Sequence, residues 1–182
     1  MSESKFPMIM QSTAAITSAI TLLLLLIFWR TQAVWALPAA ISFGTTAYHF
    51  VMRLAVGYVI PRITGYRFDY RKAWFQPRKW EAPLYRKLKV KRWKGHIPTY
   101  APSQFSLKTN STLRVIQNMC GAELVHEVIM VLSFLPLLTV PIFGEFPVFF
   151  LTSLLSALFD SLFVIAQRYN RPRLIRIYEK QK

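Results

Sequence analysis

The hydrophobic residues of this sequence come in long blocks, and most of the charged residues lie between them. The four blocks occupy residues about 12–29, 34–60, 115–140 and 146–166. A helix that crosses a bilayer needs about 20 consecutive, mostly apolar residues. A soluble domain would instead interrupt its apolar positions with polar ones at the period of a helix or strand. We therefore predict an all-α integral membrane protein with about four transmembrane helices, in a single membrane domain over residues 1–182.

The composition agrees with a membrane protein. Hydrophobic residues make up 53% of the 182 residues, and the one cysteine excludes a fold held by intramolecular disulfides. That cysteine, Cys120, is expected to be a small buried thiol. No charge occurs from Phe6 to Trp29, and we interpret this block as an uncleaved span rather than a signal peptide. Pro and Gly residues between the last two blocks predict a short turn, so these blocks should form an antiparallel hairpin.

The positive charges predict how the helices are oriented. Fourteen Lys or Arg residues lie in the segment 61–114, against two acidic ones, and six more lie in the tail 167–182. The two remaining connections carry one charged residue each. Because Lys and Arg are enriched in cytoplasmic loops, we predict that this segment, the tail and both termini are cytoplasmic. The chain would then be a multi-pass protein of the cell membrane, with the lipid bilayer as its first partner.

The segment 61–114 is basic, but aromatic residues interleave with its cations. Disordered basic tails are usually poor in aromatics, so we expect short interfacial helices with Trp and Tyr at headgroup level. Two interpretations of the segment remain open: a surface that binds anionic lipid, or a site for a phosphorylated donor such as coenzyme A. The net charge of +15 would also suit nucleic acid, but a patch pressed against an anionic membrane serves that poorly, so no nucleic-acid partner is predicted.

Five ionisable residues lie at a similar depth inside the predicted spans, where charged groups are costly and usually functional. They are Arg53, Glu123, His126, Glu127 and Asp160, on three different helices. At a rise of 1.5 Å per residue, all five are expected roughly 8–15 Å below the cytoplasmic boundary. Position alone leaves two interpretations open. The residues could form a chemical site, or Arg53 could neutralise Glu127 or Asp160 and simply hold the helices together.

Three of these residues can share one helix face, because Glu123, His126 and Glu127 are spaced three and four residues apart. A carboxylate beside a histidine can orient the ring as a general base for a hydroxyl group. Glu and His at this spacing also occur in metal sites of helix bundles. Those sites repeat the motif on a second helix and this chain does not, so we predict no metal.

Three stretches of the sequence together resemble the glycosyl-4,4'-diaponeurosporenoate acyltransferase family, the membrane enzymes of glycosylated carotenoid pathways. They are Val90-Lys-Arg-Trp-Lys94 followed by Ile97-Pro98, Ala122-Glu-Leu-Val-His126, and Gln167-Arg-Tyr-Asn-Arg-Pro-Arg-Leu174. The resemblance covers roughly residues 74–174, and the third stretch is the most specific. It implies transfer of a fatty acyl group to a sugar hydroxyl of a glycolipid acceptor such as a glycosylated carotenoid.

The resemblance also implies roles for the matching positions. Glu123 and His126 would form a catalytic acid–base pair. The residues expected to contact the donor are Lys91, Arg92, Trp93 and Lys94, and those expected to line the mouth of the site are Arg168, Asn170, Arg171 and Arg173. Arg53, Glu127 and Asp160 are further candidates for substrate binding because of their depth. The donor would be acyl-CoA or another acyl thioester, with no tightly bound cofactor. The sequence departs from the family pattern at Cys120-Gly121 and at Glu127, beside the expected base.

A non-enzymatic function is the alternative interpretation. The chain would then be a lipid-binding membrane scaffold or accessory subunit whose basic segment binds anionic headgroups or a partner. Under this interpretation, function would be lost when Lys89, Lys91, Arg92 and Lys94 are replaced together. Replacing Glu123 or His126 singly would have no effect. A small transporter component is disfavoured, because the polar cluster is not repeated between the two halves of the chain.

Overall fold

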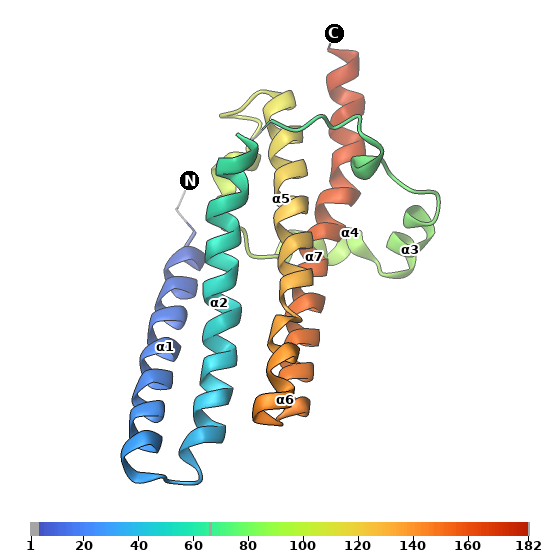
Figure 1. The fold of residues 1–182 in the computed structure, drawn as a ribbon. Helices are drawn as coiled ribbons and strands as arrows, with labels where there is room; N and C mark the ends of the chain where they lie inside the picture. The colour runs from blue at the N-terminus through green and yellow to red at the C-terminus, as the bar shows by residue number, and fades with distance from the viewer. Residues whose placement is uncertain (1–3, 66, 182) are drawn as a thin grey trace. The chain divides into compact units, whose positions relative to one another are not determined.

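The computed structural model describes residues 4–65 and 67–181, and all regular structure within these ranges is helical. The long helices are α1 (Phe6–Thr31), α2 (Ala36–Thr64), α5 (Thr112–Leu132) and α7 (Phe146–Lys180) (Figure 1). The described residues form no strand, so the predicted all-α class is confirmed.

Three stretches of the described residues are long and apolar enough to cross a membrane. They are α1, the stretch Thr112–Phe143 that begins with α5, and α7, with mean hydropathies of 2.0, 1.9 and 2.1. Large apolar side chains face outward on them; Leu22 and Trp29 of α1, for example, are both 69% exposed. An apolar exterior over such lengths fits lipid rather than water, so the structure supports association with a membrane.

The second predicted span, residues 34–60, is helical but is not among these three stretches. α2 has 29 residues, which is enough to cross a bilayer. Its sequence is less apolar than that of the other long helices, because it contains His49, Arg53 and many small residues. Three of the four expected spans are thus supported by length and hydropathy, and α2 remains the expected fourth.

The chain divides into two compact units, which we describe separately. Unit 1 comprises Tyr58–Val128 and residues 159–181, together with Ser4. Unit 2 comprises Lys5–Gly57 and Ile129–Leu158. Parts of α2, α5 and α7 belong to each unit.

Unit 2 contains α1, most of α2 and the short helices η4 (Leu135–Thr139) and α6 (Val140–Phe143). α1 and α2 lie side by side as an antiparallel pair (Figure 1). They approach closely at Gly44, where an added Cβ would lie 3.2 Å from Thr21 Cγ2. Small residues at such points let membrane helices pack closely. An apolar cavity of about 420 Å³ is lined by α1, α2, η4, α6 and the start of α7, with Gly44 and Tyr48 among its lining residues.

Unit 1 contains the basic segment, which folds into several short helices. They are η1 (Ala73–Phe75), α3 (Glu81–Lys87), α4 (Val90–Trp93), η2 (Lys94–His96) and η3 (Pro102–Phe105). α3 has an acid in its first turn and two bases in its last, which complements the helix dipole. Tyr70 and Phe75 of the segment pack against Ile116 and Cys120 of α5 in a small core. The short helices are as predicted, whereas their interfacial position stays a prediction.

α7 extends well beyond the last predicted span, which was expected to end near residue 166. The helix continues to Lys180 and includes Pro172 in its interior. Proline has no backbone N–H and so removes one hydrogen bond from the helix. The part of α7 after residue 166 therefore depends on contacts that neighbouring residues make. The basic tail therefore belongs to α7 within unit 1, where Arg168 and Arg171 form ion pairs.

Candidate active site

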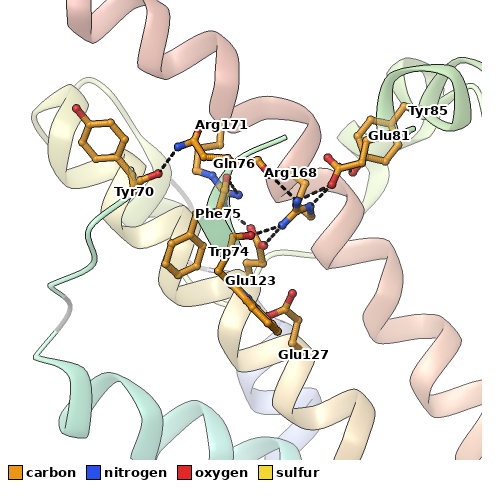
Figure 2. A network of polar contacts seen from close by, with 10 residues as sticks. All are labelled: Tyr70, Trp74, Phe75, Gln76, Glu81, Tyr85, Glu123, Glu127, Arg168 and Arg171. Carbon is orange, nitrogen blue, oxygen red and sulfur yellow. Dashed lines mark hydrogen bonds and ion pairs between the residues drawn. The ribbon is translucent and has the colours of Figure 1, made fainter. Parts of the chain in front are cut away.

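Two arginines of α7 meet one buried carboxylate of α5 in unit 1 (Figure 2). Arg168 Nη1 donates a hydrogen bond to Glu123 Oε1 at 2.6 Å, and Arg171 Nη1 donates one to Glu123 Oε2. Glu123 is 0% exposed and Arg171 is 1% exposed. Burying a charge is costly unless it is paired and hydrogen-bonded, and here each carboxylate oxygen receives a charge-assisted bond. Glu123 is thus the internal counterion of both arginines.

A second buried carboxylate, Glu81 at the start of α3, also binds Arg168. Arg168 Nε donates to Glu81 Oε1 at 2.8 Å, and the Tyr85 hydroxyl donates to Glu81 Oε2 at 3.1 Å (Figure 2). Burial, followed by the charge of Glu81, raises the pKa of Tyr85, so its phenol keeps the proton that it donates. One guanidinium therefore links α3 to α5.

The same two arginines hold the backbone of η1. Arg168 donates to the carbonyls of Trp74 and Gln76, both at 2.9 Å, and Arg171 Nη2 donates to the carbonyl of Phe75 at 2.5 Å (Figure 2). η1 is a single turn, so its carbonyls have few helical partners and need others. The network of Glu81, Glu123, Arg168 and Arg171, here called the arginine clasp, fastens the basic segment to α5 and α7.

His126 has a different carboxylate partner from the one the sequence predicted. Its Nδ1 lies 2.7 Å from Asp160 Oδ1 on α7. The expected partner, Glu123, is instead occupied by Arg168 and Arg171. α5 and α7 run antiparallel in unit 1. Glu123 therefore faces the arginines at 168 and 171, whereas His126, one turn later on α5, faces the earlier residue Asp160 of α7. Asp160, expected only to bind substrate, therefore replaces Glu123 as the carboxylate beside the imidazole.

The surroundings of His126 favour a fixed ring with one free nitrogen. The imidazole stacks on Phe163, with centroids 4.3 Å apart and planes within 11° of parallel. The Asp160 side chain is 1% exposed, whereas that of His126 is 21% exposed. A carboxylate at Nδ1 favours the tautomer that carries its proton there. Nε2 then presents a lone pair, and it has no hydrogen-bond partner in the described part of the chain. This arrangement can serve a general base.

The remaining predicted residues of α7 lie with the basic segment. Lys94 Nζ donates to Asn170 Oδ1, which joins η2 to α7. Arg173 Nη2 donates to the Tyr169 hydroxyl at 2.9 Å, one turn back on the same helix. The structure therefore brings Lys94, Asn170 and Arg173 together around Tyr169.

The other three residues expected to contact the donor differ among themselves. Trp93 Nε1 donates to the Leu88 carbonyl at 2.9 Å, so its ring stabilises the turn after α3. Lys91 and Arg92 are exposed on α4. The structure thus gives Trp93 a local structural contact and leaves the two cations at the surface.

Glu127 and Arg53 each have defined partners. Glu127 Oε2 accepts a bond from Trp74 Nε1 at 2.8 Å (Figure 2). Arg53 lies in unit 2, where its Nη2 donates to Ser156 Oγ at 2.7 Å. Ser156 Oγ and Ser133 Oγ are also 2.7 Å apart, and Ser133 donates to a backbone carbonyl of α5 at 2.8 Å. Because Ser133 donates its only hydroxyl proton to the backbone carbonyl, Ser156 is the donor in the hydrogen bond between the two serines.

Sequence reasoning missed four residues of unit 1: Glu81, Tyr85, Phe163 and Tyr169. A signal for Glu81 was present, because it is one of only two acids among the fourteen cations of the segment 61–114. Phe163 lies three residues after Asp160, on the same helix face. Within the described residues, no group of three or more His, Cys, Asp or Glu side chains could hold a metal ion.

The departures from the family pattern at Cys120-Gly121 are packing features. Cys120 is 0% exposed, so the expected buried thiol is confirmed. At Gly121 an added Cβ would lie only 2.9 Å from Cε2 of Phe68. Glycine therefore allows the aromatic ring of the basic segment to lie directly against α5.

Comparison with known families decides the class of protein. The profile of the glycosyl-4,4'-diaponeurosporenoate acyltransferase family matches residues 71–180, more than half of the chain. The chain belongs to this family. The resemblance predicted from three motifs is confirmed, and the match to the acyltransferase family includes the arginine clasp and the His126–Asp160 pair. No curated protein and no solved structure matches the chain.

Proposed function

We propose that this protein transfers a fatty acyl group from a thioester donor to a sugar hydroxyl of a membrane glycolipid, with a glycosylated carotenoid as the acceptor. The family name supports acyl transfer to such an acceptor. The observation that carries the mechanism is the His126–Asp160 pair, whose remaining ring nitrogen is unoccupied by any described residue.

In the proposed reaction, His126 Nε2 takes the proton of the acceptor hydroxyl while the oxygen of that hydroxyl attacks the thioester carbonyl carbon. A C–O bond forms, the C–S bond of the tetrahedral intermediate then breaks, and the imidazolium returns the proton to the departing thiolate. Asp160 holds the proton on Nδ1 throughout and stabilises the imidazolium. General base catalysis of this kind contributes about 10²- to 10⁴-fold to a rate.

The arginine clasp has a positioning role in this proposal. It fixes α5 against α7 about one turn from His126 and about two turns from Asp160, and a catalytic base must be held to within a fraction of an ångström. In this proposal Glu123 does not touch the substrate. It sets the position of α5 relative to α7 within unit 1, and thereby the position of His126. Because arginines bind both of its carboxylate oxygens, Glu123 is a positioning residue in this proposal rather than the acid–base partner of His126.

The predicted topology completes the proposal. With four spans and both termini in the cytoplasm, unit 1 would face the side of the cell where acyl thioesters are made. The acyl chain and the lipid acceptor would approach from the bilayer. The many exposed apolar side chains of α1 and α7 support this placement.

Lipid mass spectrometry tests the proposal directly. The chain is expressed in cells that make a glycosylated carotenoid, either unchanged or as His126→Gln. His96→Gln is the matched control, because His96 lies exposed in η2. The unchanged chain and the control should convert the glycolipid to a species heavier by one acyl group. His126→Gln should abolish that species while the protein still accumulates in the membrane.

Full acylation by His126→Gln would reject the general-base mechanism. Absence of any acylated lipid with the unchanged chain would favour the alternative of a lipid-binding scaffold.

A further inference from the structure

The structure divides the cations expected at the site into two groups. Arg168 and Arg171 are committed to buried carboxylates and backbone carbonyls. Lys91, Arg92, Lys94 and Arg173 form no ion pair with a carboxylate of the described chain. Only the second group is therefore available to an anionic ligand.

Tyr169 gathers two of these cations. Lys94 Nζ lies 5.0 Å from the centre of its ring, and the Arg173 guanidinium carbon lies 4.6 Å from it. Cations within about 6 Å of an aromatic ring are attracted by it. The hydrogen bonds of Arg173 to the Tyr169 hydroxyl and of Lys94 to Asn170 hold both side chains in place.

The aromatic platform is itself anchored to the arginine clasp. Tyr169 packs edge-to-face on Tyr85, with centroids 6.0 Å apart. Tyr85 in turn donates its hydroxyl proton to buried Glu81. Lys94 and Arg173 are thus held by contacts to the half-buried residues Tyr169 and Asn170, while Arg173 itself stays exposed.

The cations of this cluster repel one another. Burial, followed by the charges of Arg173 and Lys91, lowers the pKa of Lys94. Lys91 is three residues before Lys94, close enough to face the same side of the short helices α4 and η2. A bound anion would relieve both the repulsion and the cost of partial burial.

We infer that Lys91, Lys94, Asn170 and Arg173 form a binding site for a phosphate group. Asn170 can donate its amide protons while its carbonyl oxygen stays with Lys94, and Arg173 can offer the guanidinium donors not used by Tyr169. Phosphate favours several converging cations with one arginine among them. The inference rests on the proposed function where the phosphate belongs to the acyl donor, as in coenzyme A. An anionic phospholipid headgroup presents the same chemistry, and the test separates the two.

Binding to the purified full chain tests the site without any turnover. The protein is placed in nanodiscs of zwitterionic lipid and titrated with adenosine 3',5'-bisphosphate, with adenosine as the phosphate-free comparison. In a second arm, the lipid is exchanged for phosphatidylglycerol, and retention of this lipid on the protein is measured by native mass spectrometry. The variants are Lys94→Gln and Arg173→Gln. Lys108→Gln and Arg176→Gln are matched controls at exposed positions outside the cluster.

Each cluster variant should weaken binding of the bisphosphate, or of phosphatidylglycerol, by about ten- to a hundredfold, since each removes a charge-assisted hydrogen bond. The controls should stay within about twofold, and adenosine should not bind. Helical circular dichroism confirms that the variants fold. An effect in the first arm alone identifies a nucleotide-bearing donor, and an effect in the second alone identifies a headgroup.

Unchanged binding by both cluster variants would overturn the inference, as would failure of the native chain to bind either probe. These outcomes are distinct from failure of the proposed function. His126→Gln should bind the probes as the unchanged chain does, so acylation by His126→Gln would reject the mechanism without touching the phosphate site.

Discussion

Glu123→Ala should strongly destabilise the protein, because it removes the shared counterion of two arginines. Arg168 would keep Glu81 and two backbone carbonyls. Arg171 would keep one hydrogen bond, to the Phe75 carbonyl, and its contact with the Phe75 ring, while its Nε already has no hydrogen-bond partner in the described chain. At 1% exposure it cannot turn to solvent without local unfolding. Removing one partner of a buried ion pair costs about 3–5 kcal/mol, and we expect a loss in that range.

The free energy of unfolding can be measured by titrating mixed micelles with SDS and following helical circular dichroism. Glu127→Ala is the matched control. Glu127 is a carboxylate one helical turn after Glu123, and it accepts one hydrogen bond, from the Trp74 indole. Losing that bond should cost about 1 kcal/mol.

A second variant isolates the charge as the cause. Combining Glu123→Ala with Arg171→Met removes the unpaired buried cation, so part of the lost stability should return. A Glu123→Ala protein within about 1 kcal/mol of the unchanged chain would refute this account of the clasp. So would a double variant less stable than Glu123→Ala alone.

Three further predictions concern packing, electrostatics and topology. Gly121→Ala should lower the free energy of unfolding by about 1–3 kcal/mol, because the added methyl group would clash with Phe68. Gly57→Ala, at a position with open space around it, should be neutral or stabilising. The same SDS titration measures both variants, and equal effects would contradict this account of the packing. Affinity for adenosine 3',5'-bisphosphate should fall with rising pH, and at a lower pH than an ordinary lysine would give, because burial and neighbouring cations lower the pKa of Lys94 and phosphate requires its protonated form. Lys94→Arg should flatten this pH profile, and an unchanged profile would contradict the assignment. In intact cells, a membrane-impermeant maleimide should label a cysteine placed at Gln32 but not one at Lys108, and the reverse pattern would invert the topology.

The helical class and three of the long apolar helices could be predicted from the sequence. A helix that crosses a bilayer needs about 20 consecutive apolar residues, and such a run is visible within one stretch of the chain. α2 was harder to assign, since His49 and Arg53 interrupt an otherwise suitable length. The helical continuation of α7 through Pro172 could not be read locally, because the clasp that supports it comes from residues distant in the sequence.

Most residues of the candidate site were predicted from the sequence, but the side chains that contact one another were not. The common depth predicted for His126 and Asp160 is consistent with their contact in the structure. The choice of Glu123 as the partner of His126 followed from spacing within one helix, which cannot reveal what the neighbouring helix contributes. Arg168 and Arg171 compete for Glu123 more strongly than a histidine does, since they are permanently charged and offer several donors. Asp160 is left for the imidazole.

The most direct test of the central claim is the turnover of purified Asp160→Asn with a defined acyl thioester and glycolipid. The carboxylate would no longer fix the imidazole tautomer, so kcat should fall by at least about ten- to a hundredfold. The unfolding free energy should change far less than in Glu123→Ala, because an amide still fills the position. A kcat within about twofold of the unchanged chain would contradict the assignment of the His126–Asp160 pair as the acid–base centre.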